Sequence, residues 1–518
     1  MRDTINRAVL LLLAAVVLTA CTPDSPSQGT NNSGNNLMLF GAENVTGAAE
    51  PLTSSEYNQL TPEEQYAVSN RLMGTLYKGI PADEFFDLSQ GLTSPKIGGG
   101  GNFINRTALQ LTRELPDSGD YLQQINENYD FNSTRYSQEM PLALMFDLPV
   151  SRDLFSHWMA YTLANTILFS PALEMESADY FDVHRVYSKL VTRLNMNMSI
   201  REIIYQHMIS QENWRRFRSP EDNTREMIEI YLGLFDRDDE VPKASQACQN
   251  WYLTGDNQDY QLVITLDENI VPQKVLGRWI NTCFDFYRNV ADHPQVIPRM
   301  IYVLVNHFFI DMDQAKRAAL VQSIANSNPT RFEHIFTAIL FSREYLINSD
   351  RPRRLEETFF NIAARIQWHP HRRFFQDLNN PSGSSSYPTL SQMKQPGLTL
   401  KLGRWPFQPL DSLSFSYYHK LVRERLLLDR RTNLTNDNDA GWEPGFLEKA
   451  GNLSEQDFIH YLFLSSVGRK ASSQEIATLN SVFVNRGYDR SDRRNQQALI
   501  TFDYISRLPE TYFNNRIN

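Results

Sequence analysis

Residues 199–208 read SIREIIYQHM, and this stretch shows how the chain folds. Ser199 stands three positions before Glu202, the spacing at which a serine side chain caps a helix and a glutamate returns a hydrogen bond. Apolar side chains follow at 200, 203, 204 and 208, which is the spacing of one helix face. The stretch therefore predicts an amphipathic helix that buries its apolar face.

The same start signals recur along the chain. Thr61 and Ser219 each stand before a proline at the first helical position, and the capping spacing returns at 330–333 and 472–475. Period-two alternation, which is typical of strands, occurs at 260–266 and 398–402. The sequence therefore predicts a mainly α fold, a multi-helix globular body with a small β-ribbon.

The N-terminus predicts export and a lipid anchor. Arg2 and Arg7 precede an apolar run over 8–18, a layout typical of a signal peptide and too short for a comfortable membrane span. The run ends in Leu18-Thr19-Ala20-Cys21, which resembles the lipobox of bacterial lipoproteins. The resemblance implies cleavage before Cys21, a diacylglycerol thioether on its thiol and often a further acyl chain on its amino group. The alternative is an ordinary signal peptide whose cleavage site contains a cysteine.

The resemblance also implies a destination. In lipoproteins of two-membrane bacteria, aspartate directly after the lipidated cysteine favours retention in the inner membrane. Thr22 stands there in this chain, and Asp24 comes too late to match that pattern. We therefore expect an outer-membrane lipoprotein, facing either the periplasm or the cell surface.

The amino-acid composition along the chain indicates where its segments and domains begin and end. Ser, Asn, Gly, Thr and Pro dominate the residues after Cys21, a composition that buries too little apolar surface to fold. The remaining body is too long for one core. We expect a signal peptide (1–20), a lipidated cysteine and flexible tether (21–56), an N-terminal helical domain (57–255), a middle helical domain (256–378), a long loop (379–405) and a C-terminal helical domain (406–518).

The net charge of the chain excludes some classes of binding partner. The formal net charge is −10 at pH 7, and removing the signal peptide makes the chain slightly more acidic. An acidic chain argues against a nucleic-acid partner and gives no steering toward anionic lipid. We expect the membrane as a partner through the lipid anchor, with an envelope protein or polysaccharide as a further one.

Cys248 and Cys283 are the other two cysteines. In an oxidising compartment they are a disulfide candidate, and two buried free thiols are the alternative. Both stand in helical-looking segments with aromatic neighbours: Trp251, Trp279, Phe284 and Phe286. We expect two helices packed through one apolar seam.

Two stretches have the residue types of a metal site without its full pattern. His369 and His371 are followed by two arginines, whose charge opposes a divalent ion. Residues 437–441 with Glu448 are similar to a calcium loop, but the glycine falls one place early. The sequence predicts no metal, cofactor or catalytic site.

Basic clusters interrupt the acidic chain at 351–354, 371–373, 423–431 and 490–494. Such clusters are usually solvated faces paired with acids, and the functional alternative is capture of phosphate or carboxylate groups on a polymer.

Residues 298–409 resemble an uncharacterised helical family of secreted bacterial proteins. The resemblance rests on Ser342-Arg343-Glu344-Tyr345, on the basic stretch 351–357 and on Gly403-Arg404-Trp405-Pro406-Phe407-Gln408-Pro409. It implies a secreted helical protein and transfers no site.

Together these features favour a non-enzymatic binding or scaffolding role at the outer membrane. The alternative is an envelope hydrolase that acts on polysaccharide or peptidoglycan. Such an enzyme needs two carboxylates that the fold brings together, which spacing along the chain does not reveal.

Overall fold

The structure is a computed structural model. It describes residues 44–96, 103–116, 140–168, 182–256, 260–266, 271–310, 312–370, 374–379, 388, 392–393, 411–428, 441–442, 444–486 and 493–517. The expected strand at 398–402 and the expected tether up to residue 43 lie outside these ranges.

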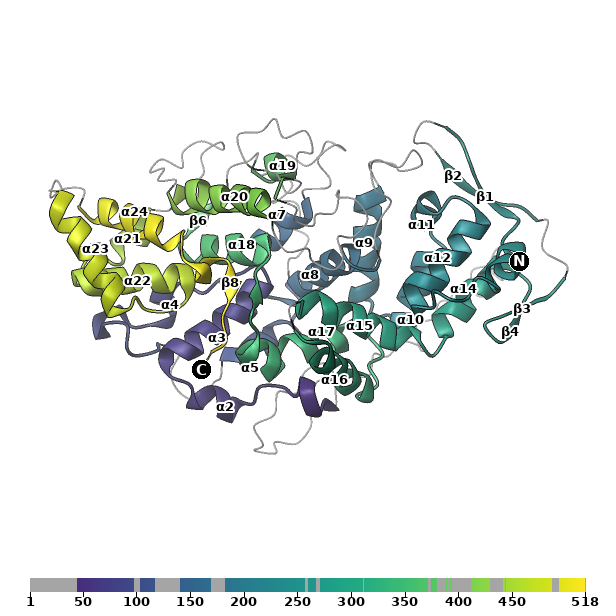
Figure 1. The fold of residues 1–518 in the computed structure, drawn as a ribbon, viewed down its shortest axis with the longest axis horizontal. Helices are drawn as coiled ribbons and strands as arrows, with labels where there is room; N and C mark the ends of the chain where they lie inside the picture. The colour runs from purple at the N-terminus through teal and green to yellow at the C-terminus, as the bar shows by residue number, and fades with distance from the viewer. Residues whose placement is uncertain are drawn as a thin grey trace, which may run out of the picture. The chain divides into compact units, whose positions relative to one another are not determined.

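The described chain is mainly α-helical, which confirms the predicted fold class (Figure 1). The helices before the first strand are α2 (Ser54–Gln59), α3 (Pro62–Thr75), α4 (Ala82–Phe85), α5 (Phe103–Gln110), α7 (Met140–Asp147), α8 (Arg152–Ala164), α9 (Asp182–Asn195), α10 (Ile200–Met208), α11 (Gln211–Arg216), α12 (Pro220–Leu232) and α13 (Val241–Ala247). Those after the ribbons are α14 (Cys283–Asp292), α15 (Val296–Phe308), α16 (Gln314–Asn326), α17 (Phe332–Leu340), α18 (Leu355–Arg365), α19 (Phe374–Asn379), α20 (Ser412–Lys420), α21 (Pro444–Glu448), α22 (Glu455–Val467), α23 (Ser473–Arg486) and α24 (Arg493–Ile505).

Short helical turns complete the list. The 3-10 turns are η2 (Gly47–Ala49), η3 (Leu88–Gln90) and η7 (Pro509–Thr511), and the π-helical turns are η5 (Glu344–Asn348) and η6 (Leu421–Leu427).

Strands form antiparallel pairs. The expected ribbon at 260–266 is present as β2 (Gln261–Ile264), which pairs with β1 (Trp251–Thr254). The other pairs are β3 (Gln273–Val275) with β4 (Arg278–Ile280), β5 (Arg351–Pro352) with β8 (Phe513–Asn514), and β6 (Trp368–His369) with β7 (Gly441–Trp442). The β5–β8 pair ties the end of the chain to the segment before α18.

At most of the predicted helix starts the capping hydroxyl accepts as expected, but in the box predicted at 199–202 the Glu202 side chain binds Arg288 and Gln206. Thr61 and Glu64 form a reciprocal capping box at α3, and the hydroxyls of Ser199 and Ser219 accept hydrogen bonds at the starts of α10 and α12. The start expected at Thr330 is wrong, because Arg331 is the N-cap of α17 and gives no side-chain cap. Buried Glu333 forms ion pairs with Arg152 and Arg331 instead of returning a hydrogen bond to the cap.

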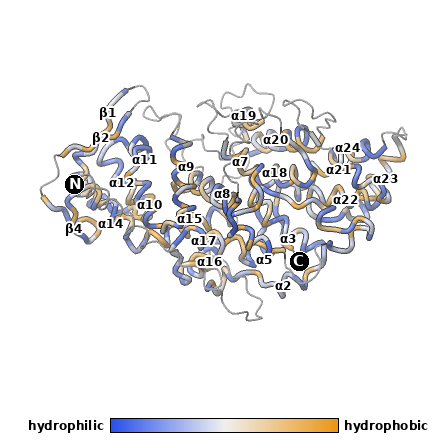
Figure 2. Tube along the Cα trace, turned by 180° about the vertical axis from the view of Figure 1, so that it is seen from behind, coloured by the Kyte–Doolittle hydropathy of each residue, from blue (hydrophilic) through white to orange (hydrophobic). Residues whose placement is uncertain are grey.

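One connected cluster of buried apolar side chains extends from Val45 to Tyr512, and Leu37–Asn518 form one compact unit. Hydrophobic and hydrophilic positions alternate along its helices, as Figure 2 shows. Contacts cross the expected domain boundaries. For example, Tyr161 Oη in the expected N-terminal domain donates to Glu356 Oε1 in the expected middle domain at 2.8 Å. The boundaries themselves stay a prediction.

The packing of α3 on α18 positions the site described below. Gly74 permits this close approach, because a Cβ there would lie 2.6 Å from the side-chain nitrogen of Asn361. That nitrogen donates to the carbonyl oxygens of Asn70 and Lys78 on and after α3. Helix α22 packs on α18 as well. In the described part of the chain, no helix is both long and apolar enough to cross a bilayer.

Candidate functional site

Arginine side chains gather around one cavity of about 180 Å³. We call this cavity the arginine pocket, and its arginines are Arg71, Arg353, Arg365, Arg469 and Arg516. Helices α3 and α18, the residues after α22 and the C-terminal segment 513–517 form its walls.

Arg71 stands on the buried face of α3 and is 9% exposed. Its Nη1 donates to the carbonyl oxygens of Leu346 at 2.8 Å and Ile347 at 3.3 Å, and its Nη2 donates to the carbonyl of Asn515. Arg71 therefore binds backbone from two distant segments and meets only neutral oxygen atoms.

Arg353 is positioned by the β5–β8 pair. Its backbone N–H donates to the Tyr512 carbonyl at 2.7 Å, and its Nε donates to Asn514 Oδ1 at 2.9 Å. The two terminal nitrogens of Arg353 have no hydrogen-bond acceptor among the described residues. These nitrogens are therefore available as donors in the arginine pocket.

Arg365 closes the opposite wall and is 1% exposed. It ends α18 and reaches the last turn of α22, where it donates to the carbonyl oxygens of Leu464 at 3.1 Å and Ser466 at 2.6 Å. A cation is favourable at this position, because the C-terminus of a helix leaves carbonyl oxygens unpaired and carries a partial negative charge.

The carboxylates of the arginine pocket are already engaged. Glu357 binds Arg351 through both oxygens, at 2.8 and 2.9 Å. Glu510 accepts a hydrogen bond from Arg469 at 2.9 Å. By contrast, no carboxylate within the described ranges forms an ion pair with Arg71, Arg353 or Arg365.

Burial is the main cause of the shifted pKa values of these arginines. Burial, with repulsion from Arg353, lowers the pKa of Arg71 to about 9. Burial, with repulsion from Arg365, lowers the pKa of Arg353 to about 10. Burial also lowers the pKa of Arg365. All three guanidinium groups are destabilised where they stand, and a bound anion would reverse that effect.

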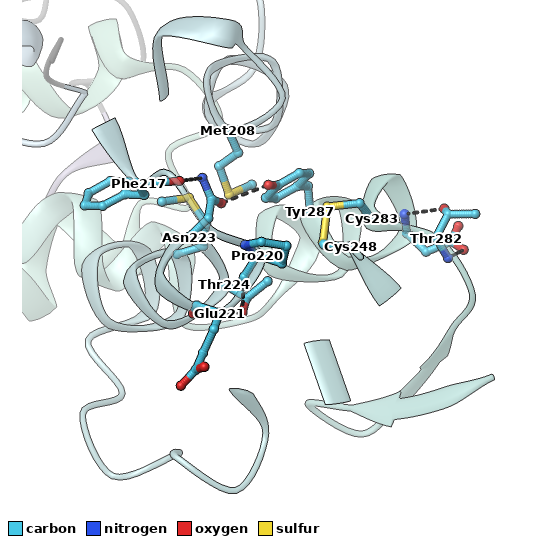
Figure 3. Close-up of a disulfide and its surroundings, with 12 residues drawn as sticks. Met208, Phe217, Pro220, Glu221, Asn223, Thr224, Cys248, Thr282, Cys283 and Tyr287 are labelled. Carbon is cyan, nitrogen blue, oxygen red and sulfur yellow. Dashed lines mark hydrogen bonds between the residues drawn. A yellow bond between two sulfur atoms is a disulfide. The ribbon is translucent and has the colours of Figure 1, made fainter. Parts of the chain in front are cut away.

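The predicted disulfide is present in the structure (Figure 3). Cys248 follows α13 and Cys283 begins α14, with Sγ atoms 2.04 Å and Cα atoms 4.4 Å apart. Both are fully buried beside Trp251 and Tyr287. The expectation that Trp279 joins the apolar seam is wrong, because Trp279 lies on β4 and is 70% exposed.

The basic clusters have different roles in the structure. At 351–354, Arg351 binds Glu357, Arg353 enters the arginine pocket and Arg354 donates to the His307 carbonyl at 2.9 Å. The surface interpretation fits Arg423, which binds Asp503 at 2.7 Å, and Arg493, which pairs with Glu455. Residues 371–373, 429–431 and 490 lie outside the described residues.

The structure describes only some of the other residues that the sequence suggested as lipidation or metal sites. Cys21, His371 and residues 437–440 of the loop similar to a calcium site lie outside the described residues. Among the residues that the structure describes, no group of three His, Cys, Asp or Glu side chains could hold a metal ion.

Sequence reasoning missed Arg71 and Arg365 as site residues. Each is a single cation in a helix with a buried face, at a position where an apolar side chain usually packs. That exception to the helical pattern was the only available signal. It could not show that the two helices meet.

Comparison of the chain with protein-family models, with curated proteins and with solved structures finds no match.

Proposed function

We propose that this protein is an envelope lipoprotein that binds an anionic group, a carboxylate or a phosphate, in the arginine pocket and does no chemistry on it. The observation that carries the proposal is the set Arg71, Arg353 and Arg365, three cations on one cavity that form no ion pair with a carboxylate of the described residues. A buried charge is costly unless it is paired, so such a set favours an anionic ligand.

Arginine suits this role. Its planar guanidinium presents donors in a fork that matches carboxylate and phosphate oxygens, and such charge-assisted hydrogen bonds are strong. Arg353 supplies the free fork, since its terminal nitrogens have no described acceptor. Arg71 and Arg365 add positive charge from positions that their backbone acceptors fix.

The binding role is favoured over the hydrolase alternative by the state of the carboxylates. A glycosidase needs one carboxylic acid to give a proton and one carboxylate to act as base or nucleophile. Glu357 and Glu510, the acids of the arginine pocket, each accept hydrogen bonds from an arginine. Burial alone would raise the pKa of Glu357, but the charges and hydrogen bonds of Arg351 and Arg354 together hold it below its ordinary value, which opposes the role of proton donor.

The anchor completes the proposal. The lipobox-like sequence that ends at Cys21 and the polar stretch after it support a lipidated, tethered protein, and Thr22 supports delivery to the outer membrane. The binding partner is then an envelope component, either a protein or a polysaccharide, that carries anionic groups.

Replacing Arg353 by Met should remove anion binding without harming the fold. Loss of the free fork should weaken the affinity for phosphate or galacturonate about tenfold or more. Without anion, the free energy of unfolding should stay within about 1 kcal/mol of the wild type, because removing a repelled cation offsets the lost packing. Titration calorimetry and thermal unfolding of the full chain in detergent measure both quantities.

Arg278→Met is the matched control, because Arg278 is an exposed arginine on β4 that does not line the arginine pocket. Wild type and Arg278→Met should gain thermal stability with anion, and Arg353→Met should not. Equal anion responses in all three proteins would contradict the proposal.

Replacing Cys21 by Ser should abolish membrane association, because no other residue offers the thioether. The wild-type protein should incorporate labelled palmitate and sediment with outer membranes in a density gradient, while Cys21→Ser should stay unlabelled and leave the membrane fraction. Wild type recovered mainly with inner membranes would overturn the destination inferred from Thr22. A Cys21→Ser protein that remains membrane-bound would overturn the anchor.

A further inference from the structure

A second cavity of about 300 Å³ adjoins the arginine pocket. It lies between η2, α16, η5 and the C-terminal segment, and Arg516 lines both cavities. Its lining combines the cations Lys316 and Arg516 with the apolar side chains Ala48, Met312, Ala319 and Leu320.

The two cavities meet at Arg516, which lines both of them. The Ile347 carbonyl oxygen accepts from Arg71 Nη1 at 3.3 Å and from the Ile517 backbone N–H at 3.0 Å, and both of these donor residues line the arginine pocket. The next residue, Asn348, lines the second cavity. The linings of the two cavities therefore come together at residues 347–348 and at Arg516.

The second cavity also has an excess of positive charge. Lys316 and Arg516 are exposed, and neither forms an ion pair in the part of the chain that the structure describes. Glu344 is the acid on the lining, and its Oε2 accepts from the Asn348 side chain at 2.7 Å. The cations thus outnumber the carboxylate, as they do in the arginine pocket.

We propose that the two cavities together bind a short organic polyanion. One anionic group lies in the arginine pocket, Arg516 contacts the ligand between the cavities, and a second anionic group pairs with Lys316. The apolar lining of the second cavity fits a carbon skeleton between the charges, as in an acidic oligosaccharide. This inference rests on the proposed function, because it takes the arginine pocket as the first subsite.

Two linked anionic groups should bind more tightly than one. Once the first group is bound, the second group is held at high effective concentration near Lys316. We expect the full-length protein in detergent to bind trigalacturonate at least about tenfold more tightly than galacturonate. Tripolyphosphate, which has no carbon skeleton, should gain less over phosphate.

Lys316→Met tests the second subsite. It should remove most of the gain for trigalacturonate and leave galacturonate binding unchanged. Lys274→Met is the matched control, since Lys274 is an exposed lysine on β3 that lines neither cavity. It should keep the gain, which separates a specific subsite from general attraction to cations.

The outcomes separate the two proposals. If galacturonate and phosphate both fail to bind the wild type, the proposed function itself fails. If they bind through Arg353 but trigalacturonate gains nothing, or gains equally in Lys316→Met, the second subsite alone is overturned. If only tripolyphosphate binds more tightly than its single unit, the inference that the second cavity holds a carbon skeleton is overturned.

Discussion

Arg351→Met should lower the free energy of unfolding by about 3–5 kcal/mol. Arg351 and Glu357 are 4% and 5% exposed and share two hydrogen bonds, and Arg351 Nη2 also donates to Tyr345 Oη at 2.6 Å. Removing the cation would leave a buried carboxylate with the Arg354 backbone N–H as its remaining described donor. Chemical unfolding of wild type and variant measures the difference.

A double-mutant cycle shows whether the pair is responsible. Arg351→Met combined with Glu357→Leu should cost less than Arg351→Met alone, because no unpaired charge remains. Arg225→Met is the exposed control, since Arg225 pairs with Glu221 one helical turn away at the surface, and it should cost less than about 1 kcal/mol. A cost for Arg351→Met as small as that of Arg225→Met would contradict the argument.

The same pair should make the free energy of unfolding depend on pH in the acidic range. Burial alone would raise the pKa of Glu357, but the charge and hydrogen bonds of Arg351, together with the charge and backbone N–H of Arg354, hold this pKa below its ordinary value of 4.5. The unfolded chain then binds protons at higher pH than the folded chain. The stabilisation is therefore present above about pH 4.5 and is lost as the pH falls through the lower folded pKa, and Arg351→Met should lose less stability on acidification than the wild type.

Local sequence signals predicted the helices well where the cap was self-contained. Thr61 finds its partner Glu64 within the same turn, and Ser199 and Ser219 likewise accept from their own helices. At Thr330 the helix instead starts one residue later, with Arg331 as its N-cap, and Glu333 pairs with Arg152 from another helix. A capping pattern cannot show that a distant cation competes for its glutamate.

The hairpin of β3 and β4 was not predicted, and the segment before Cys283 was interpreted as helical. Its turn consists of Leu276 and Gly277, with φ of 48° and 81°. Two consecutive positive φ angles belong to a turn for which Asn-Gly is the usual signal, and leucine is unfavourable there. The turn therefore has the glycine of the usual Asn-Gly signal but not the asparagine. The strands on either side are only three residues long, which leaves little period-two alternation to detect.

The candidate site was predictable in one part only. The cluster 351–354 drew attention to phosphate or carboxylate capture, and Arg353 is the member that lines the arginine pocket. The other arginines of the cluster have different partners: Arg351 binds Glu357 and Arg354 donates to the His307 carbonyl. Arg71, Arg365 and Arg516 come from segments far apart in the sequence, so tertiary packing alone brings them together.

Loss of the Cys248–Cys283 disulfide should lower the free energy of unfolding by about 3–4 kcal/mol. The bond closes a loop with a sequence separation of 35, and the enclosed chain contains both β1–β2 and β3–β4. These ribbons bury few side chains, among them Trp251, Val275 and Ile280. They therefore contribute little of their own to offset the entropy that the open loop gains in the unfolded chain.

The double variant Cys248→Ala/Cys283→Ala in a Cys21→Ser background isolates this effect. Alanine leaves no buried hydroxyl, and the background removes the third thiol. The variant should lose the same stability that reductant takes from the Cys21→Ser parent, and reductant should change it no further. Hydrogen exchange should rise first between residues 249 and 282, because the ribbons open before the helices beside them. Two reactive thiols per denatured, unreduced parent chain would show that the bond does not form in the cell, and the whole argument for its stabilising role would fall.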